Sequence, residues 1–515
     1  MSARELSNNT LLVHLSLARC GLTRVGDLNF PNLHVLDLNE KKLKEIHLAE
    51  LRGLPHLERL SVSGNPLVTL FSVAGDRTGV VMSALRVLDV SRLNLKVLDV
   101  SFLPALPELH TVNLSAAGVH VLTGEGFRSL RKLRVLDLRG CPLTHFPRDI
   151  LQGLDDLQAV YADNYRLCCP ATLPSHFNEQ NCHAPSDEVS SCEALLRSVT
   201  YRVFLSVFAA LSLLGNASSF VYRVFMQRKQ KKLSFDVFVA HLCVADFLMG
   251  VYLAVIGVVD RLYQGTYLWE DDTWRNGATC KVAGFLSLVS SEVSALIIAL
   301  ITIDRFLVLR FPFSNFRFEV RSAQVACFSV WMLGVLLAGL PLLSLTDDWQ
   351  FYGQTGICIP LPITRSDFPG HSYAFGVMIV ANFVLFMVIT VGQVFIYWSI
   401  RANAMSSNET TRQSHDLTIA RRLLTVAMSD FLCWFPIGLL GLLSSSGVPI
   451  PGEVNVAMAI FVLPFNSALN PFLYTLNVVL ERRRRLHFQR IQKHLLAQLR
   501  SLKTDAQKWS AVDNR

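Results

Sequence analysis

The feature that most constrains the fold is a set of apolar stretches, each about twenty residues or longer, that recur beyond residue 200. A helix of about twenty residues crosses the roughly 30 Å hydrocarbon layer of a bilayer. We therefore expect membrane-spanning helices near residues 201–225, 234–259, 280–309, 322–345, 372–399, 418–444 and 454–478. Composition agrees, because only 17% of the 515 residues are charged, against about 25% in soluble domains.

Basic residues in alternate loops predict the orientation of these helices. They are Arg228, Lys229, Lys231 and Lys232 in the first inner loop, Arg310, Arg317 and Arg321 in the second, and Arg482 to Arg485 in the tail. The loops between them carry mostly acids. Because Lys and Arg favour the cytoplasmic side, we expect an extracellular N-terminus in a multi-pass plasma-membrane protein. The net charge of +8 is then membrane-flanking charge that meets lipid headgroups, not a nucleic-acid surface.

Four cysteines stand just before the first span, namely Cys168, Cys169, Cys182 and Cys192. Such crowding predicts a disulfide framework, which places the segment outside the cytosol. A four-cysteine zinc site is the alternative. The adjacent Cys168–Cys169 pair argues against it, because zinc ligands come in spaced pairs.

The first part of the chain is a repeat array. The template LxxLxLxxN/CxL begins at seven leucines with a period of 21 to 28 residues, at Leu12, Leu33, Leu57, Leu85, Leu109, Leu133 and Leu157. This period predicts an α/β leucine-rich-repeat solenoid. The Asn or Cys of each template bonds the turning backbone, so Cys20 and Cys141 are expected to be structural thiols. MSARELSNNT lacks the apolar core of a signal peptide, and we expect the natural start to lie upstream.

One position between the strand leucines faces the concave surface of the array. It is occupied by Ser16, Asp37, Ser61, Asp89, Asn113, Asp137 and Tyr161. The acids Asp37, Asp89 and Asp137 in line predict a basic ligand. Because neither Asp89 nor Asp137 packs the core, we expect reversal of these two charges to abolish ligand binding and to leave surface expression and basal signalling intact. The alternative is that they only keep a polar sheet face soluble. The sequons at Asn8 and Asn113 are expected to carry glycans, whereas Asn408, on an inner loop, is not.

Polar residues also lie deep within the apolar stretches. They are Asn216, Asp246, Glu292, Ser294, Asp304, Arg305, Asp430, Asn466 and Asn470. Because such residues are expensive in lipid, each predicts a functional role.

The motifs around these residues resemble those of the rhodopsin-like G-protein-coupled receptors. They are GN at Gly215-Asn216, LCVAD ending at Asp246, DRF at Asp304 to Phe306, Trp331, CWFP at Cys433 to Pro436, and NPFLY at Asn470 to Tyr474. Within that superfamily the chain resembles the leucine-rich-repeat hormone receptors of the relaxin-receptor type. The segments SSEVSALIIALITIDRF, SDFLCWFP, LPFNSALNPFLYTL, NYRLCCP and SSCEALL carry this likeness.

The resemblance implies a receptor that binds a relaxin- or insulin-like peptide hormone through its repeats and signals to a heterotrimeric G protein. Relaxin-like peptides present arginines on a helix of the B chain, which suits an acidic face. A glycoprotein-hormone type of ligand is the runner-up. The chain departs from the family pattern: the low-density-lipoprotein-receptor-type module and the N-terminal repeat cap are absent, helix five has no proline, and Gln393 stands where a tyrosine is expected.

The resemblance also implies roles for individual residues near the inner side. Arg305 has two candidate acidic partners, its neighbour Asp304 and Asp416, which the family places at the inner end of helix six. We expect Arg305 and Asp416 to form the latch that opens for the G protein; the alternative for Asp416 is a helix N-cap. Asn470, Pro471 and Tyr474 would complete the G-protein switch. Cys280 and Cys358 look like the loop disulfide of the family.

A cation site is implied in mid-membrane. Asp246, Ser294, Trp434, Asn466 and Asn470 occupy positions that line a small sodium site in this superfamily, beside Asn216, and a carboxylate with neutral oxygens suits a hard cation. No other cofactor is expected. Asp430 is expected to hydrogen-bond Asn470 and hold the resting state; the alternative is a protonated core carboxyl with no switch role.

Two segments flank the bundle. Cys192 and Glu193 resemble the hinge segment that acts as an internal agonist in related hormone receptors, with Cys192 bonded to Cys168 or Cys169. After Tyr474, cationic and apolar residues alternate at helical spacing, which predicts an amphipathic helix along the inner leaflet. The expected domains are 1–167 (repeats), 168–199 (hinge), 200–479 (seven helices) and 480–515 (amphipathic helix and tail).

Two other classes of protein were weighed. An enzyme has little support, because the sequence contains no glycine-rich phosphate loop, HExxH zinc motif or GxSxG elbow. A non-signalling repeat adhesion protein is the stronger rival, since repeats alone indicate binding. The DRF, CWFP and NPFLY motifs argue against it.

Overall fold

The chain divides into two compact units in a computed structural model. The structure describes residues 10–19, 23–40, 42–67, 69–71, 81–123, 127–226, 233–311, 317–359, 369–406, 429, 431–433, 435–448, 450–476, 491–492 and 495. The first unit is Met1–Ala194 together with Gly265–Asp272, and the second is Leu195–Gln264 together with Thr273–Arg515. The division falls inside the segment that the sequence marks as a hinge.

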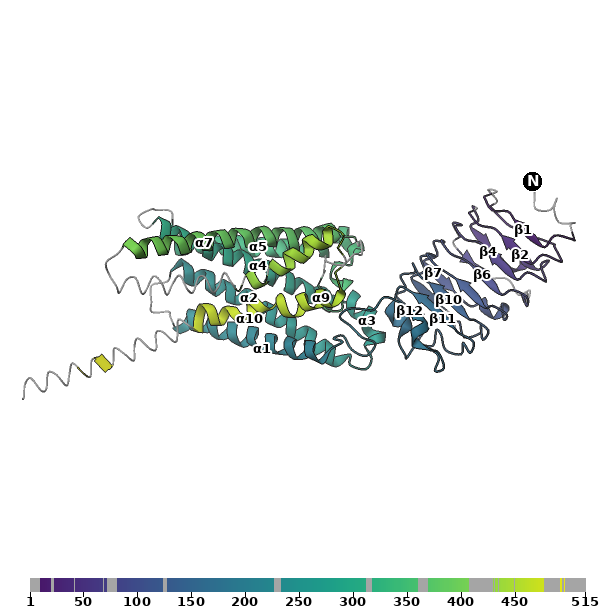
Figure 1. Ribbon diagram of the computed structural model, residues 1–515, viewed down its shortest axis with the longest axis horizontal. Coiled ribbons are helices and arrows are strands. Elements are labelled where there is room, and N and C mark those ends of the chain that lie inside the picture. Colours follow the sequence, from purple (N-terminus) through teal and green to yellow (C-terminus); the bar gives the residue numbers. More distant parts are fainter. Residues whose placement is uncertain are drawn as a thin grey trace, which may run out of the picture. The chain divides into compact units, whose positions relative to one another are not determined.

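The first unit is built on an eight-stranded parallel sheet (Figure 1). Its strands, in spatial order, are β1 (His14–Ser16), β2 (Val35–Asp37), β4 (Arg59–Ser61), β6 (Val87–Asp89), β8 (Thr111–Asn113), β10 (Val135–Leu138), β11 (Ala159–Ala162) and β12 (Cys182–His183). Two small sheets, β3 (Glu45–Ile46) with β5 (Thr69–Leu70) and β7 (Val97–Asp99) with β9 (Val121–Thr123), follow the same period. The predicted solenoid is confirmed, with 3-10 turns and no α-helix among the described residues of the array.

The template residues explain why the units stack. Leucines of every repeat join one buried core, and single strand leucines such as Leu36 and Leu60 have no exposed surface. Asn65 closes its turn from inside, because its amide donates to the carbonyls of Leu38 and Val62 at 2.9 and 2.7 Å. The Cys141 thiol lies 3.1 Å from the Leu114 carbonyl, and burial raises its pKa. Cys141 is therefore a structural thiol, as expected.

Two disulfides close the end of the array, Cys168–Cys182 and Cys169–Cys192. The first fixes β12 as the last strand of the sheet, in register with Tyr161 through His183. The second joins the last repeat to the segment that precedes the membrane helices. Of the two partners considered for Cys192, the structure selects Cys169.

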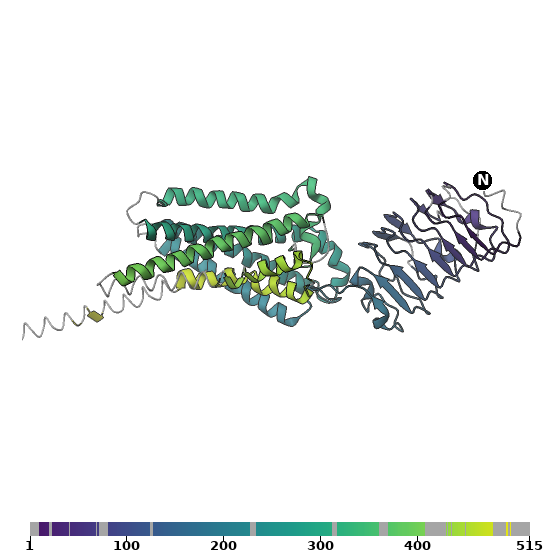
Figure 2. The same ribbon diagram turned by 45° about the horizontal axis from the view of Figure 1, so that its top comes forward.

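The second unit is a helix bundle (Figure 2). Its helices are α1 (Val199–Val221), α2 (Ser234–Leu262), α4 (Ala278–Arg310), α5 (Val320–Gly339), α6 (His371–Ala374), α7 (Asn382–Ser406), α9 (Gly452–Ala457) and α10 (Phe465–Pro471). The helix α3 (Tyr267–Asn276) lies in an outer loop, and its residues up to Asp272 belong to the first unit. Wider π turns extend α1 over Tyr222–Met226, join α6 to α7 over Phe375–Ala381, and flank α10.

Six described helices are long and apolar enough to cross a membrane, and they match six of the predicted spans. They are Val199–Phe225, Ser234–Leu262, Ala278–Val308, Val320–Leu342, His371–Ser399 and Gly452–Thr475. A shorter apolar helix, Phe431–Ser445, overlaps the remaining predicted span and ends one residue beyond it. The inner half of that span lies outside the described residues.

Candidate functional site

A buried carboxylate lies at the centre of the helix bundle. Asp246 of α2 has no exposed surface and accepts three hydrogen bonds. Ser294 of α4 donates to Oδ1 at 2.9 Å, Ser467 of α10 to the same oxygen at 3.0 Å, and Asn470 to Oδ2 at 2.7 Å. One acidic side chain therefore ties together three of the membrane-spanning helices.

Of the residues predicted for this site, the structure brings Ser294 and Asn470 to Asp246. Asn466 is buried in the same helix as Asn470, whereas Trp434 and Asp430 lie outside the described residues. Sequence reasoning missed Ser467. Its signal was present, because a residue three positions before Asn470 shares its helix face.

The first helix joins this site through the GN motif. The Asn216 amide donates to the Ser467 carbonyl at 2.9 Å. At Gly215 an added Cβ would meet the Pro471 ring at 2.9 Å. The motif therefore needs glycine so that α1 can approach the proline of NPFLY closely. It needs asparagine to donate a hydrogen bond to the backbone of α10.

The DRF motif forms a closed ion pair at the inner end of α4. Arg305 contacts the Asp304 carboxylate through Nε at 3.0 Å and Nη2 at 2.5 Å. Asp304 is fully buried and also accepts the Ser234 hydroxyl at 2.9 Å. Arg305 thus pairs with Asp304, the other candidate acid. Asp416, the partner predicted for the latch, lies outside the described residues.

At the outer side, Cys280 and Cys358 form a disulfide, so the expected loop bridge is present. The Trp274 indole donates to the Gly356 carbonyl at 2.7 Å, which fixes the same loop. The second predicted span ends at residue 259, one position before Asp260. In the structure Asp260 belongs to α2 and is 2% exposed.

Asp260 holds the end of the hinge within the helical unit. Its Oδ1 accepts the Leu196 backbone N–H at 2.8 Å, and its Oδ2 lies 2.9 Å from Nε of Arg202. Arg202 in turn donates to the Leu196 carbonyl at 3.0 Å. The backbone N–H and carbonyl of Leu196 are thus both bound by the Asp260–Arg202 ion pair. Leu195 and Leu196 have no exposed surface.

The preceding hinge residues bond to outer-loop residues of the first unit. The Glu193 carbonyl accepts the Gly265 N–H at 2.6 Å, and the Cys192 carbonyl accepts the Leu268 N–H at 3.2 Å. The hinge segment predicted to be an agonist, Cys192 and Glu193, therefore lies in a fixed backbone arrangement closed by the Cys169 disulfide.

The predicted concave column is in register across the whole sheet. Ser16, Asp37, Ser61, Asp89, Asn113, Asp137 and Tyr161 pair in sequence from strand to strand, and His183 extends the column. The Asp and Asn side chains also have a structural role that the sequence analysis overlooked.

Each acid of this column closes the turn after its own strand. The carboxylates accept the N–H two residues later at 3.0 to 3.1 Å, at Asn39, Ser91 and Arg139 respectively, and Asn113 does the same with Ser115. Charge reversal would remove this bond, a contact that the argument from core packing alone did not include. Asp137 is also paired with Arg139 through Nη2 at 2.5 Å, and that guanidinium lies 5.0 Å from the Tyr161 ring.

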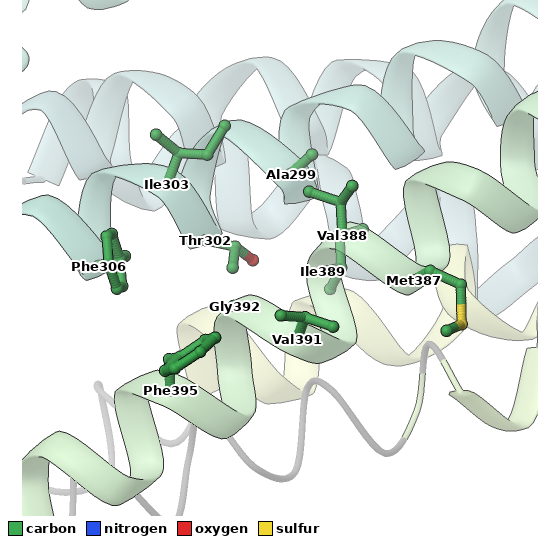
Figure 3. Close-up of a pocket in the computed structure, with 10 residues that line it drawn as sticks. All are labelled: Ala299, Thr302, Ile303, Phe306, Met387, Val388, Ile389, Val391, Gly392 and Phe395. Atoms are coloured by element: carbon green, nitrogen blue, oxygen red, sulfur yellow. The ribbon is translucent and has the colours of Figure 1, made fainter.

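An apolar groove of about 400 Å³ lies between α4 and α7 (Figure 3). Its lining includes Phe306, Met387 and Phe395, and the hydroxyl group in this lining belongs to Thr302. That hydroxyl is occupied, because it donates to the Ile298 carbonyl at 3.0 Å and accepts the Gln393 amide at 3.1 Å. Gln393, which replaces the expected tyrosine, thus ties α7 to α4, and the groove offers no hydroxyl that could orient a polar ligand.

Several other residues that the sequence singled out have no described structure. Asn8, Cys20, Asn408, the basic residues of the first inner loop and Arg482 to Arg485 lie outside the described residues.

Comparison with known proteins agrees with this arrangement. The family described as 7 transmembrane receptor (rhodopsin family) matches residues 216–474, and the Leucine rich repeat families match residues 10–67 and 132–154. The chain is 37% identical over 328 residues to the G-protein coupled receptor GRL101 of Lymnaea stagnalis, covering 64% of this chain and 29% of that protein.

Two hormone receptors are also similar. Relaxin receptor 2 of Homo sapiens is 33% identical over 62% of this chain and 42% of its own length. The lutropin-choriogonadotropic hormone receptor of Mus musculus is 27% identical over 60% and 42%. The chain spans less than half the length of these relatives. Hydrogen bonds connect the GN, LCVAD and NPFLY motifs in one buried site. Because the match of the receptor family covers half of the chain, the chain belongs to the rhodopsin family of seven-transmembrane receptors, with a leucine-rich-repeat ectodomain.

Proposed function

We propose that this receptor binds an extracellular peptide hormone of the relaxin or insulin type on its repeats and couples to a heterotrimeric G protein. The observation that carries the proposal is the closed Asp304–Arg305 pair at the inner end of α4. An arginine that cannot lose its charge needs an acidic partner when water is scarce. Opening of this pair would release Arg305 to a G protein.

The ectodomain supports a peptide ligand. An extended concave sheet face, with polar side chains in register, is the surface that solenoid proteins use for binding. Asn113 stands in the middle of this column, so a glycan there would obstruct a peptide lying across the sheet. We therefore propose that the glycan on Asn8 and the peptide coexist, and that a glycan on Asn113 excludes the peptide.

The hinge would transmit binding. Cys192 and Glu193 bond outer-loop residues, and Leu196 is held by Asp260. A strained or displaced hinge would change these bonds first, which fits the role of an internal agonist. The tail would lie on the inner leaflet.

We expect cells that express the full chain to respond to a synthetic relaxin-type two-chain peptide with a change in cyclic nucleotide or calcium. Arg305→Ala should remove this response at equal surface expression, because the variant lacks the group that meets the G protein. Expression is measured with an epitope added ahead of Met1. Binding without any response, in parent and variant alike, would favour the adhesion alternative, and a response only to a glycoprotein hormone would favour that ligand class.

Asp430 and Asp416 remain proposed restraints of the resting state. The amide oxygen of Asn470 is buried and has no hydrogen-bond partner among the described residues. A protonated Asp430 one turn from Trp434 would supply a donor of the right kind. This supports the proposed Asp430–Asn470 bond.

We further propose that the Asp246 site binds a sodium ion. A single buried carboxylate and two serine hydroxyls are ligands that suit a hard cation. Bound sodium would neutralise the carboxylate and hold α2, α4 and α10 together. These oxygen atoms come from three helices, so the ion would favour one arrangement of the bundle.

Sodium should raise the thermal midpoint of the purified chain when it replaces choline at constant ionic strength. A ligand at ten times its dissociation constant stabilises by about 1.4 kcal/mol, and Asp246→Asn should remove the dependence on sodium. The measurement is thermal unfolding in detergent, with potassium as the control cation. Equal sodium dependence in parent and Asp246→Asn would place the ion elsewhere.

A further inference from the structure

Two arginines share one aromatic ring at the inner side of the bundle. Phe235, in the first turn of α2, has the guanidinium carbon of Arg305 at 4.8 Å from its ring centroid and that of Arg223 at 5.7 Å. Both distances lie within the roughly 6 Å over which a cation is attracted by the face of an aromatic ring. Sequence reasoning assigned no role to either Phe235 or Arg223.

Three consecutive residues of α2 hold both arginines. Ser234 donates to Asp304, the carboxylate that pairs with Arg305. Phe235 contacts both guanidinium groups. Asp236 pairs with Arg223 at 2.9 Å. The segment Ser234–Phe235–Asp236 therefore contacts both members of the DRF pair. Ser234 hydrogen-bonds Asp304, and the ring of Phe235 faces Arg305.

The same segment reaches the NPFLY motif. Arg223, whose side chain is 4% exposed, donates from Nη2 to the Tyr474 carbonyl at 2.6 Å. The Tyr474 ring centroid lies 6.3 Å from that of Phe235. The π turn Phe472–Leu476, which follows α10, and the inner end of α4 are thus linked through one ring and one buried arginine.

We propose that Phe235 is a positioning residue that holds Arg305 in its resting orientation, and that Arg223 fixes Phe235 to the backbone of NPFLY. The proposal rests on the coupling to a G protein proposed above, because that is the role Arg305 serves. A leucine at 235 would retain apolar volume but lose the π face. A tyrosine would retain both.

We expect Phe235→Leu to raise ligand-independent signalling about two- to fivefold at equal surface expression, the change in population that corresponds to a half-buried cation–π contact. Phe235→Tyr is the matched control and should signal like the parent. Equal increases in both variants would mean that shape, and not the ring, restrains Arg305. No increase in Phe235→Leu, in cells where the parent signals above untransfected cells, would also overturn the proposal.

A second measurement does not depend on coupling. A guanidinium over a ring face has an upfield-shifted Nε–H proton, which can be followed by NMR of the detergent-solubilised full chain and assigned by its loss in Arg305→Lys. The shift should be present in the parent and Phe235→Tyr and absent in Phe235→Leu. Its absence from the parent would overturn the proposed contact. If the shift behaves as expected and the parent does not signal, the contact stands and the proposed coupling has failed.

Discussion

Asp260→Asn is expected to lower the stability of the helical unit by roughly 3 kcal/mol. Removing one partner of a buried ion pair costs about 3 to 5 kcal/mol, and the lower end applies because 19% of the Arg202 side chain is exposed. Asparagine can still accept the Leu196 N–H, so the loss isolates the missing charge. At roughly 2 to 4 °C per kcal/mol, the thermal midpoint of the purified full chain should fall by about 6 to 12 °C.

The double variant Arg202→Gln with Asp260→Asn is the control for this experiment. It contains no buried unpaired charge, and both amides can still bond the Leu196 backbone. We expect it to recover more than half of the lost thermal stability. A double variant as unstable as Asp260→Asn would show that the charge of Arg202 is not the cause, and that the carboxylate acts mainly on the hinge backbone.

The repeat period and the motif spacing predicted most of the fold because both can be read directly from the sequence, without knowledge of how the elements pack. Equivalent template positions lie one period apart, so their alignment from Ser16 to Tyr161 follows once the units stack. His183 was missed because β12 belongs to no template and is added to the sheet by the Cys168–Cys182 disulfide. A disulfide pairing cannot be read from spacing alone.

Residues whose role depends on helix rotation could not be predicted in the same way. Asp260 stands one residue beyond the predicted span, where an acid is normally solvated, but α2 continues to Leu262 and buries it. Phe235 looks like an ordinary apolar residue at a membrane boundary. Its function follows only from the approach of Arg223 and Arg305 from two other helices. Ser467 is intermediate, because helical spacing relates it to Asn470 but only packing brings it to Asp246.

The second large expected effect is on ligand binding at the concave face. Because the acids there also close turns, the variants that test binding must keep those bonds. Asp89→Asn keeps the bond that closes the turn, as Asn113 does naturally at the equivalent position, and removes only charge. Asp137 is already neutralised by Arg139. Among the described residues, the second oxygen of Asp89 accepts only a hydrogen bond from Ser61, at 3.2 Å. The two acids, equivalent in sequence, should therefore differ in their contribution to binding.

We expect Asp89→Asn to weaken binding of a synthetic relaxin-type peptide by roughly 2 kcal/mol, the lower end for truncating a desolvated charge pair, or about 30-fold in Kd. Asp137→Asn should change Kd much less, because Asp137 is already neutralised by Arg139 and the charge left on that exposed arginine is screened by solvent. Kd and the association rate are both measured on the purified chain at low and high salt. Equal, small effects of both variants would mean that the acids only close turns and keep the sheet soluble. A larger effect at Asp137 would mean instead that the ligand recognises the Asp137–Arg139 pair, and so presents an acid of its own beside its cations.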